Sequence, residues 1–153
     1  MKTRLNKKYR KAVFIVVYSL TKKEPVYLLL KRKLHWKGWE FPKGAIEKNE
    51  SSIEAVRREL FEETGLYPLK IKKFNYKGRY KYKKILKDRP NFIGQTFSLF
   101  AAEVKIKKIK IDKKEHSGFK WLSFSNAYKT LTWPNQKKSL KIVNSWLSKN
   151  GKK

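Results

Sequence analysis

The acidic residues of this chain gather in one stretch, although the chain as a whole is strongly basic. Its 153 residues include 40 Lys and Arg against 12 Asp and Glu, a formal net charge of +28. Carboxylate oxygens are the ligands that Mg²⁺ and Mn²⁺ prefer, so such a cluster in a basic chain predicts a site for a divalent cation. Seven of the acidic residues fall between Gly44 and Leu66 or just upstream: Glu40, Glu47, Glu50, Glu54, Glu59, Glu62 and Glu63.

The local pattern predicts that a helix carries most of these carboxylates. Ser51 followed by Glu54 matches a capping box, and Gly65 matches a helix stop, with about fourteen residues between them. The solvated acidic face of an ordinary helix is the alternative interpretation of the same pattern. At roughly 100° per residue, one side is expected to pack and the acidic side to face outward. The packing side would hold Ile53, Val56, Arg57 and Leu60, and the acidic side Glu59, Glu62 and Glu63.

The spacing of the fixed residues carries a family resemblance. Gly44, Glu50 and the run from Arg58 to Leu66 match the pattern Gx5Ex7REUxEExGU, with U aliphatic. The chain therefore resembles the Nudix hydrolases, which cleave nucleoside diphosphates linked to another group. The resemblance implies an α/β/α sandwich with a mixed β-sheet and a loop–helix–loop catalytic segment. We expect a single domain over 1–148 and a disordered basic tail over 149–153.

The resemblance also implies roles for individual residues. Mg²⁺, or Mn²⁺ in its place, would be held by the Gly44 carbonyl and by Glu59, Glu62 and Glu63. Arg58 would brace a glutamate, with Glu50 farther from the metal. Glu115, ahead of the predicted strand Phe119 to Leu122, is the candidate for a further metal ligand or base, and Glu103 is the alternative. The residues expected to act in catalysis are Glu63, Glu62, Arg58 and Glu115.

Candidate substrate contacts lie on either side of the acidic stretch. Lys43 precedes Gly44 and could contact a phosphate. The stretch Ile71 to Lys83 alternates with period two, so aromatic residues share one face and basic residues the other. This pattern fits a plain core strand, or tyrosines that stack a nucleobase beside cations that hold phosphates. The candidates on this strand are Tyr76, Arg79, Tyr80 and Tyr82.

Several local motifs bear on the substrate, and they disagree. Trp39 to Gly44, the PNQ segment after Trp133, and Tyr82 resemble diadenosine tetraphosphate hydrolases, which predicts asymmetric hydrolysis to ATP and AMP. The segment Ile93 to Phe100 instead resembles RNA pyrophosphohydrolases. A nucleoside triphosphate or sugar-nucleotide pyrophosphatase, and a non-catalytic nucleotide- or RNA-binding domain, are further alternatives. The expected partner is a nucleoside polyphosphate, with RNA as the alternative and no membrane, and the chain is expected to be a monomer or homodimer.

The elements that must position these residues follow from pattern. Ala12 to Leu20 is β-branched and aromatic, which predicts a strand and not a signal peptide, with Pro25 to Leu30 as its antiparallel partner. Gln95 to Ile106 predicts another strand, and the stretches 31–44, 84–94 and 105–114 are expected to be loops. Two helices are expected near the C-terminus. The first spans Asn126 to Thr130, and the second is capped by Asn135 with an apolar stripe of Leu140, Val143, Trp146 and Leu147.

Composition sets outer limits on function. The absence of cysteine excludes disulfides, thiolate zinc sites and a cysteine nucleophile, and it agrees with a reducing cytoplasm, the expected location. Apolar runs fall short of the roughly eighteen residues that a membrane span needs. The charge of +28 fits either attraction for RNA and polyphosphate or compositional drift toward lysine.

Overall fold

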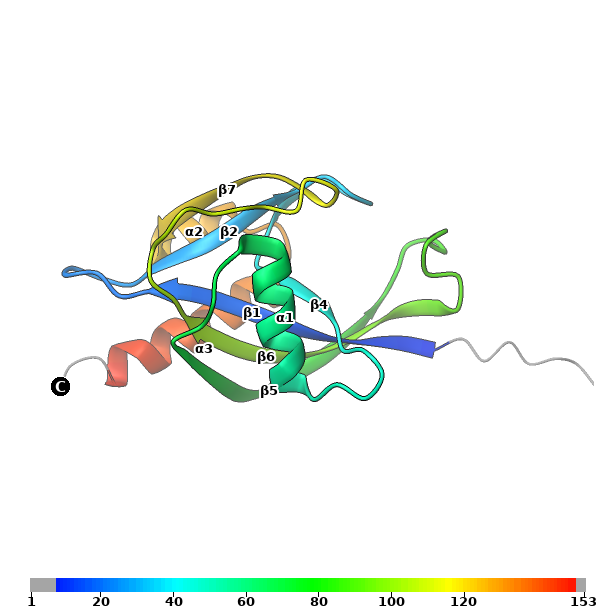
Figure 1. Cartoon of the computed structure of the whole chain (residues 1–153), viewed down its shortest axis with the longest axis horizontal. Coiled ribbons are helices and arrows are strands. Elements are labelled where there is room, and N and C mark those ends of the chain that lie inside the picture. The colour runs from blue at the N-terminus through cyan, green and yellow to red at the C-terminus, as the bar shows by residue number, and fades with distance from the viewer. Residues whose placement is uncertain (1–7, 151–153) are drawn as a thin grey trace, which may run out of the picture.

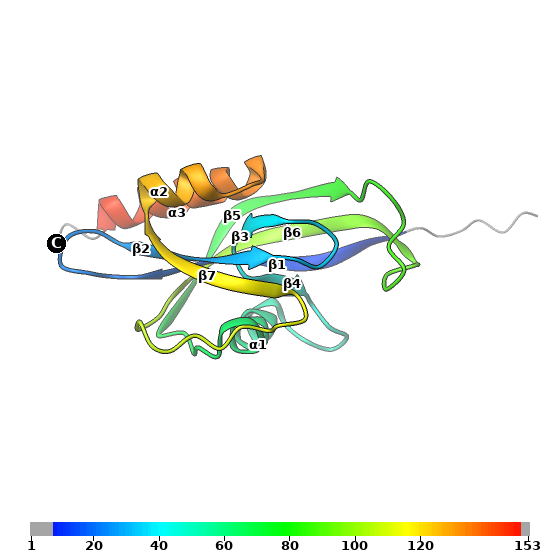
Figure 2. The ribbon, with the colours of Figure 1, turned by 90° about the horizontal axis from the view of Figure 1, so that it is seen from above.

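A mixed β-sheet lies between helices in the computed structural model, which describes residues 8–150 (Figure 1). Helix α1 covers one face of the sheet, and helices α2 and α3 cover the other (Figure 2). The strands are β1 (Lys8–Ser19), β2 (Val26–Arg32), β3 (Gly38–Glu40), β4 (Lys43–Ala45), β5 (Lys70–Lys81), β6 (Phe92–Glu103) and β7 (His116–Ser123). The helices are α1 (Ser52–Thr64), α2 (Phe124–Thr130) and α3 (Pro134–Asn150).

The sheet runs β3-β2-β1-β6-β5, with β4 also pairing with β1 and β7 with β2. Strands β1 and β6 are parallel along most of their length, and β5 is antiparallel to β6 at the edge. The predicted antiparallel pair of β1 and β2 forms only beside their turn, at Tyr18 with Tyr27 and Ser19 with Val26. Farther along, β4 takes the place beside β1, so Gly44 pairs with Val13.

Alternation along β1 divides the core into two layers. Val13, Ile15 and Val17 pack with residues of α1 on one face. Phe14, Val16 and Tyr18 pack on the other face with residues of α3. All are buried, as expected for a strand covered on both faces. The three-layer sandwich predicted from the family resemblance is therefore confirmed.

Helix α1 has the predicted ends. Ser51 and Glu54 form a reciprocal capping box, and Gly65 ends the helix with φ of 77°, a left-handed conformation that favours glycine. The predicted orientation of its faces is partly wrong. Ile53 and Arg57 are exposed, whereas Glu63 is buried together with Ala55, Val56, Leu60 and Thr64. The helix crosses both β1 and β4, so its inward side extends past the aliphatic stripe to Glu63.

Several predicted boundaries are corrected by tertiary pairing. The stretch 31–44, predicted as a loop, contains the end of β2 and the short strands β3 and β4. Asn135 does not cap α3, because the helix begins at Pro134 and the Trp133 carbonyl accepts the first backbone bonds. Proline suits this first position because the helix needs no N–H there. Lys149 lies inside α3 and not in a tail, and residues 151–153 of the expected tail lie outside the described part.

Residues 8–150 contain no helix that is both long and apolar enough to cross a bilayer.

Candidate metal and phosphate site

Strand β4 brings the backbone of Gly44 against the carboxylate of Glu59 on α1. A Cβ atom on Gly44 would collide with the Glu59 carboxyl group, so only glycine leaves room for this approach. The neighbouring backbone N–H of Lys43 donates to Glu63 Oε1 over 3.3 Å. Gly44 on β4 therefore meets Glu59 and Glu63, which lie one turn apart on α1.

Arg58 holds the carboxylates of the helix in a fixed arrangement. Its guanidinium donates to both oxygens of Glu50, at 2.7 and 2.9 Å, and to Glu59 Oε2 at 2.9 Å. It also donates to the Ala45 carbonyl at 2.8 Å, which ties α1 to the end of β4. Glu62 accepts a longer bond of 3.2 Å from Arg58, and its side chain is 54% exposed. Glu62 thus lies at the rim, apart from the other two glutamates.

A small cleft opens above these residues, and side chains of both charges line it. Four cationic side chains face three carboxylates across it. The lining consists of Arg10, Arg32, Lys43, Gly44, Glu59, Glu63, Arg89, Gln95 and Glu115. Such a cleft can hold a cation at the carboxylates and phosphate groups at the guanidiniums.

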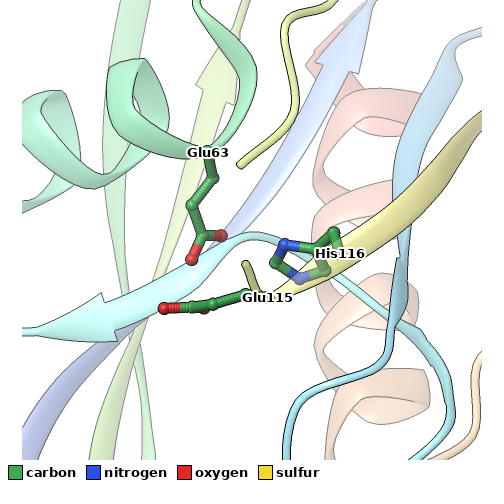
Figure 3. A group of neighbouring side chains, drawn as sticks. All are labelled: Glu63, Glu115 and His116. Atoms are coloured by element: carbon green, nitrogen blue, oxygen red, sulfur yellow. The ribbon is translucent and has the colours of Figure 1, made fainter. Parts of the chain in front are cut away.

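Glu115 approaches Glu63 from the segment before β7 (Figure 3). Ligand atoms of Glu63, Glu115 and His116 all lie within 4.8 Å of one another. Behind them, His116 Nε2 lies 2.8 Å from Glu40 Oε2. The buried Arg32 bridges Glu40 and Glu115 at 3.1 Å each. This chain of contacts orients Glu115 toward the cleft.

The carboxylates of the cleft crowd one another in a poorly solvated place. Burial raises the pKa of Glu63 well above its ordinary value, and the neighbouring Glu40, Glu115 and Glu59 raise it further. Burial also raises the pKa of Glu59 to about 7, against the opposing effect of Arg58. Glu40 behaves differently, because Lys43, His116 and Arg32 lower its pKa in spite of its burial.

These residues fit a divalent cation. Carboxyl groups with raised pKa values lack enough positive charge nearby, and a bound cation supplies it. Among residues 8–150, Glu40 Oε1 and His116 Nδ1 are buried without a hydrogen-bond partner, which adds unused ligand capacity next to the cluster. Ligand atoms of Glu63 and Glu115 lie close enough together to share such a cation, and Glu59 lines the same cleft.

The predicted substrate residues divide into two groups. Lys43 lines the cleft, as does Gln95. Tyr82 donates to Gln95 Oε1 over 3.0 Å, and Gln95 Nε2 donates to the Tyr80 hydroxyl at 3.0 Å, so both hydroxyl groups lie next to the cleft lining. Tyr76 instead packs edge-on against Phe97, and Arg79 lies over the Tyr9 ring. Neither residue of the second group lines the cleft.

Sequence reasoning assigned no role to several residues that the fold brings to the site. Arg10 and Arg89 both donate to Gln95 Oε1, at 3.2 and 3.4 Å. Gln95 belongs to the motif Ile93 to Phe100 described above, but the neighbouring residues do not predict the direction of its side chain. Arg32 and His116 were also without an assigned role, and Glu40 was counted in the acidic cluster but given no task of its own. These three residues reach the site from three different strands.

Comparison with known proteins agrees with this geometry. The family model of the NUDIX domain matches residues 8–142. An RNA pyrophosphohydrolase of Pasteurella multocida is 37% identical over 97 residues, covering 56% of this chain and 49% of that protein. One from Nitratiruptor is 33% identical over 133 residues, covering 83% and 86%. This chain thus spans about half the length of the first relative and most of the second.

A solved structure shows the same fold at lower identity. The Caenorhabditis elegans Ap4A hydrolase binary complex superposes with a TM-score of 0.73 and 20% identity, covering 92% of this chain and 98% of that one. The family match extends over most of the chain, and it includes the elements that build the cleft. The chain belongs to the Nudix family.

Proposed function

We propose that this chain is a metal-dependent hydrolase that cleaves a phosphoric anhydride bond in a nucleotide substrate. One observation carries the proposal: Glu59, Glu63 and Glu115 line a single cleft together with Arg10 and Arg89. The carboxylates suit a divalent cation, and the guanidiniums suit the oxygens of a polyphosphate. Both are needed where water attacks a phosphorus that negative oxygens surround.

Each residue has a separate task in this proposal. A bound Mg²⁺ would neutralise phosphate charge and lower the pKa of a bound water. Glu59 and Glu63 would hold the cation, while Arg58 keeps the Glu59 carboxylate in place. Glu115, which Arg32 orients, is the candidate to accept the proton from the attacking water.

The favoured substrate is the 5′ end of RNA. Both relatives described above are named RNA pyrophosphohydrolases. Gln95, from the segment that resembles those enzymes, lines the cleft and contacts Arg10, Arg89, Tyr80 and Tyr82. These cations and rings could receive the 5′ phosphates and the first base.

Diadenosine tetraphosphate is the second candidate, and it is the substrate that the motifs around Lys43 and Trp133 favoured. Lys43 lines the cleft, and the Tyr82 hydroxyl contacts Gln95 in the cleft lining, so its ring is our candidate to stack on adenine. The products of asymmetric hydrolysis would be ATP and AMP. The Tyr80 and Tyr82 rings could stack on a base of either substrate, so an activity assay must distinguish the two.

The test incubates the protein with Mg²⁺ and, separately, with 5′-triphosphorylated RNA and diadenosine tetraphosphate. Ion-exchange chromatography resolves the products. Faster release of pyrophosphate or phosphate from RNA supports the favoured substrate, and faster formation of ATP and AMP supports the second. Turnover of neither substrate by the protein, or equal turnover by the Glu59→Gln variant, would contradict the proposal.

A further inference from the structure

A second basic and aromatic surface lies across the sheet from α1. It is the groove between β5 and α3, with a volume of about 940 Å³. Figure 2 shows α3 and α2 together on this face, opposite the helix that carries the metal-binding glutamates. Five lysines and three aromatic side chains line the groove, and its lining contains no carboxylate. We call this surface the β5–α3 groove.

We propose that the β5–α3 groove binds single-stranded RNA, as an extension of the substrate site. This proposal rests on the proposed function in one respect, the choice of RNA as the polymer. The main support for it is charge complementarity between the groove and a nucleic acid. β5 and α3, both wholly within residues 8–150, contain ten Lys and Arg residues and no Asp or Glu. The lysines alone would fit any polyanion. The aromatic rings of the groove favour a nucleic acid, because bases can stack on them.

Lysines and rings are interleaved in the groove. Lys72 Nζ lies 5.6 Å from the centre of the Phe74 ring, and Lys141 Nζ lies 5.7 Å from that of Tyr128. At the rim, Lys138 Nζ lies 5.2 Å from the Tyr76 ring. Where a ring and an ammonium stand this close, a base can stack on the first while its phosphate meets the second. Unpaired bases can stack in this way, whereas a duplex hides them.

Aromatic residues spaced along one face of β5 lead from the groove toward the cleft. Phe74 lines the groove, and Tyr76 and Tyr80 follow on the same face of β5. Tyr80 and Tyr82 then hydrogen-bond to Gln95, which lines the cleft. At about 3.3 Å per residue, the path from Phe74 to Tyr82 measures roughly 26 Å. An RNA strand with its 5′ end in the cleft could therefore continue over β5 toward α3.

The first experiment measures binding apart from chemistry. Fluorescence anisotropy with a labelled 5′-hydroxyl RNA of about 20 nucleotides reports the groove, because this RNA carries no 5′ phosphate to hydrolyse. The groove variant combines Lys72→Gln, Lys138→Gln and Lys141→Gln, all at exposed positions. The control combines Lys105→Gln, Lys107→Gln and Lys108→Gln, exposed residues of the segment that passes on the α1 face (Figure 2). Both variants lose the same charge.

The groove variant is expected to bind RNA roughly tenfold more weakly than the control variant. Its plot of log affinity against log salt should be shallower by about 2, since each lost contact to a single strand removes about 0.7. Equal affinities of the two variants would overturn the proposal. So would retention on vesicles of anionic lipid together with no binding to RNA, because the surface would then recognise a membrane.

Kinetics separate this inference from the proposed function. The groove variant should show a raised KM for long triphosphorylated RNA and an unchanged kcat, with normal turnover of a triphosphorylated dinucleotide. An unmutated protein that binds RNA through the groove but hydrolyses none would refute the substrate assignment and leave the groove standing. Normal RNA hydrolysis with identical KM values for the groove and control variants would refute the groove proposal and leave the proposed function standing.

Discussion

Glu63 is a buried carboxyl group with three other carboxyl groups around it. Burial and the charges of Glu40, Glu115 and Glu59 raise its pKa well above the ordinary value, and burial raises the pKa of Glu59 to about 7. In the metal-free protein these groups resist ionisation. A cation can stabilise the ionised forms, so metal binding and proton release are linked.

This linkage predicts how the stability of the metal-free protein depends on pH. The folded state keeps protons on Glu59 and Glu63 at pH values where the unfolded chain has released them, so it binds more protons. The free energy of unfolding therefore falls as pH rises from about 4.5 to about 7. Thermal unfolding in EDTA at pH 5.5 and pH 8 measures the fall. Glu63→Gln should reduce it, and an unchanged pH dependence in that variant would refute the assignment.

Loss of the Glu63 carboxylate should also remove function. Glu63→Gln keeps the size of the side chain but removes its charge, so we expect turnover to fall by at least about 100-fold, more than outer contacts usually cost. Unfolding in EDTA at pH 8 should show no loss of stability, because the variant removes a carboxyl group whose ionisation is unfavourable in the folded state. Full activity at saturating Mg²⁺ would show that Glu63 is not a ligand.

Gly44 offers a sharper test of geometry, because no charge changes. In Gly44→Ala the new methyl group collides with the Glu59 carboxyl, which must move away from the ligand position. We expect weaker Mg²⁺ binding and at least about tenfold lower kcat. The control is Gly118→Ala on β7, where a Cβ would meet no heavy atom within 4 Å. Equal effects of the two variants would contradict the close approach at Gly44.

At the scale of elements, α1 presents its glutamates only if its first turn and Arg58 are in place. The Ser51 side chain accepts the Glu54 N–H at 3.1 Å, and the Glu54 carboxylate accepts the Ser51 N–H at 2.8 Å. Arg58 then joins the helix to Glu50 in the preceding loop and to Ala45 at the end of β4. The loop and the helix therefore act as one unit.

The capping box should make a measurable contribution to stability. Ser51→Ala removes the side-chain acceptor and is expected to cost about 1 kcal/mol of the free energy of unfolding. Urea unfolding of the metal-free protein measures it. Ser52→Ala, one residue later and without a capping contact, serves as the control and should change stability by less than about 0.5 kcal/mol. If Ser52→Ala costs as much, the capping box is not what stabilises α1.

The molecule as a whole carries a charge of +28, and its carboxylates are concentrated at one site. Like charges on the rest of the surface repel one another, which opposes the compact state. Salt screens interactions between exposed charges beyond about 10 Å at 0.1 M. The same surface charge that could attract RNA should therefore destabilise the free protein at low salt.

We expect the free energy of unfolding to rise with NaCl between roughly 0.05 and 0.5 M, because screening reduces this repulsion. Urea unfolding at several salt concentrations, in EDTA, measures the effect. The combined Lys105, Lys107 and Lys108→Gln variant has three fewer charges and should show a smaller rise. A fall in stability with salt would mean that surface ion pairs outweigh the repulsion.

Patterns among neighbouring residues were enough to predict α1 and the two faces of β5. The capping box, Gly65 and the spacing of Gly44, Glu50 and Glu59 determined the helix and its glutamates from residues close in sequence. The period-two alternation of β5 likewise predicted its aromatic and basic faces. Both succeed because helix and strand periods are properties of neighbouring residues.

Tertiary structure alone decided which distant residues meet. The parallel pairing of β1 with β6 brings Arg10 to Gln95, and the pairing of β4 with β1 brings Gly44 beneath Glu59. The burial of Glu63, predicted to face outward, follows from the path of α1 over β4. Contacts between residues on different elements depend on strand order and register. Strand order and register are fixed only when the whole core packs.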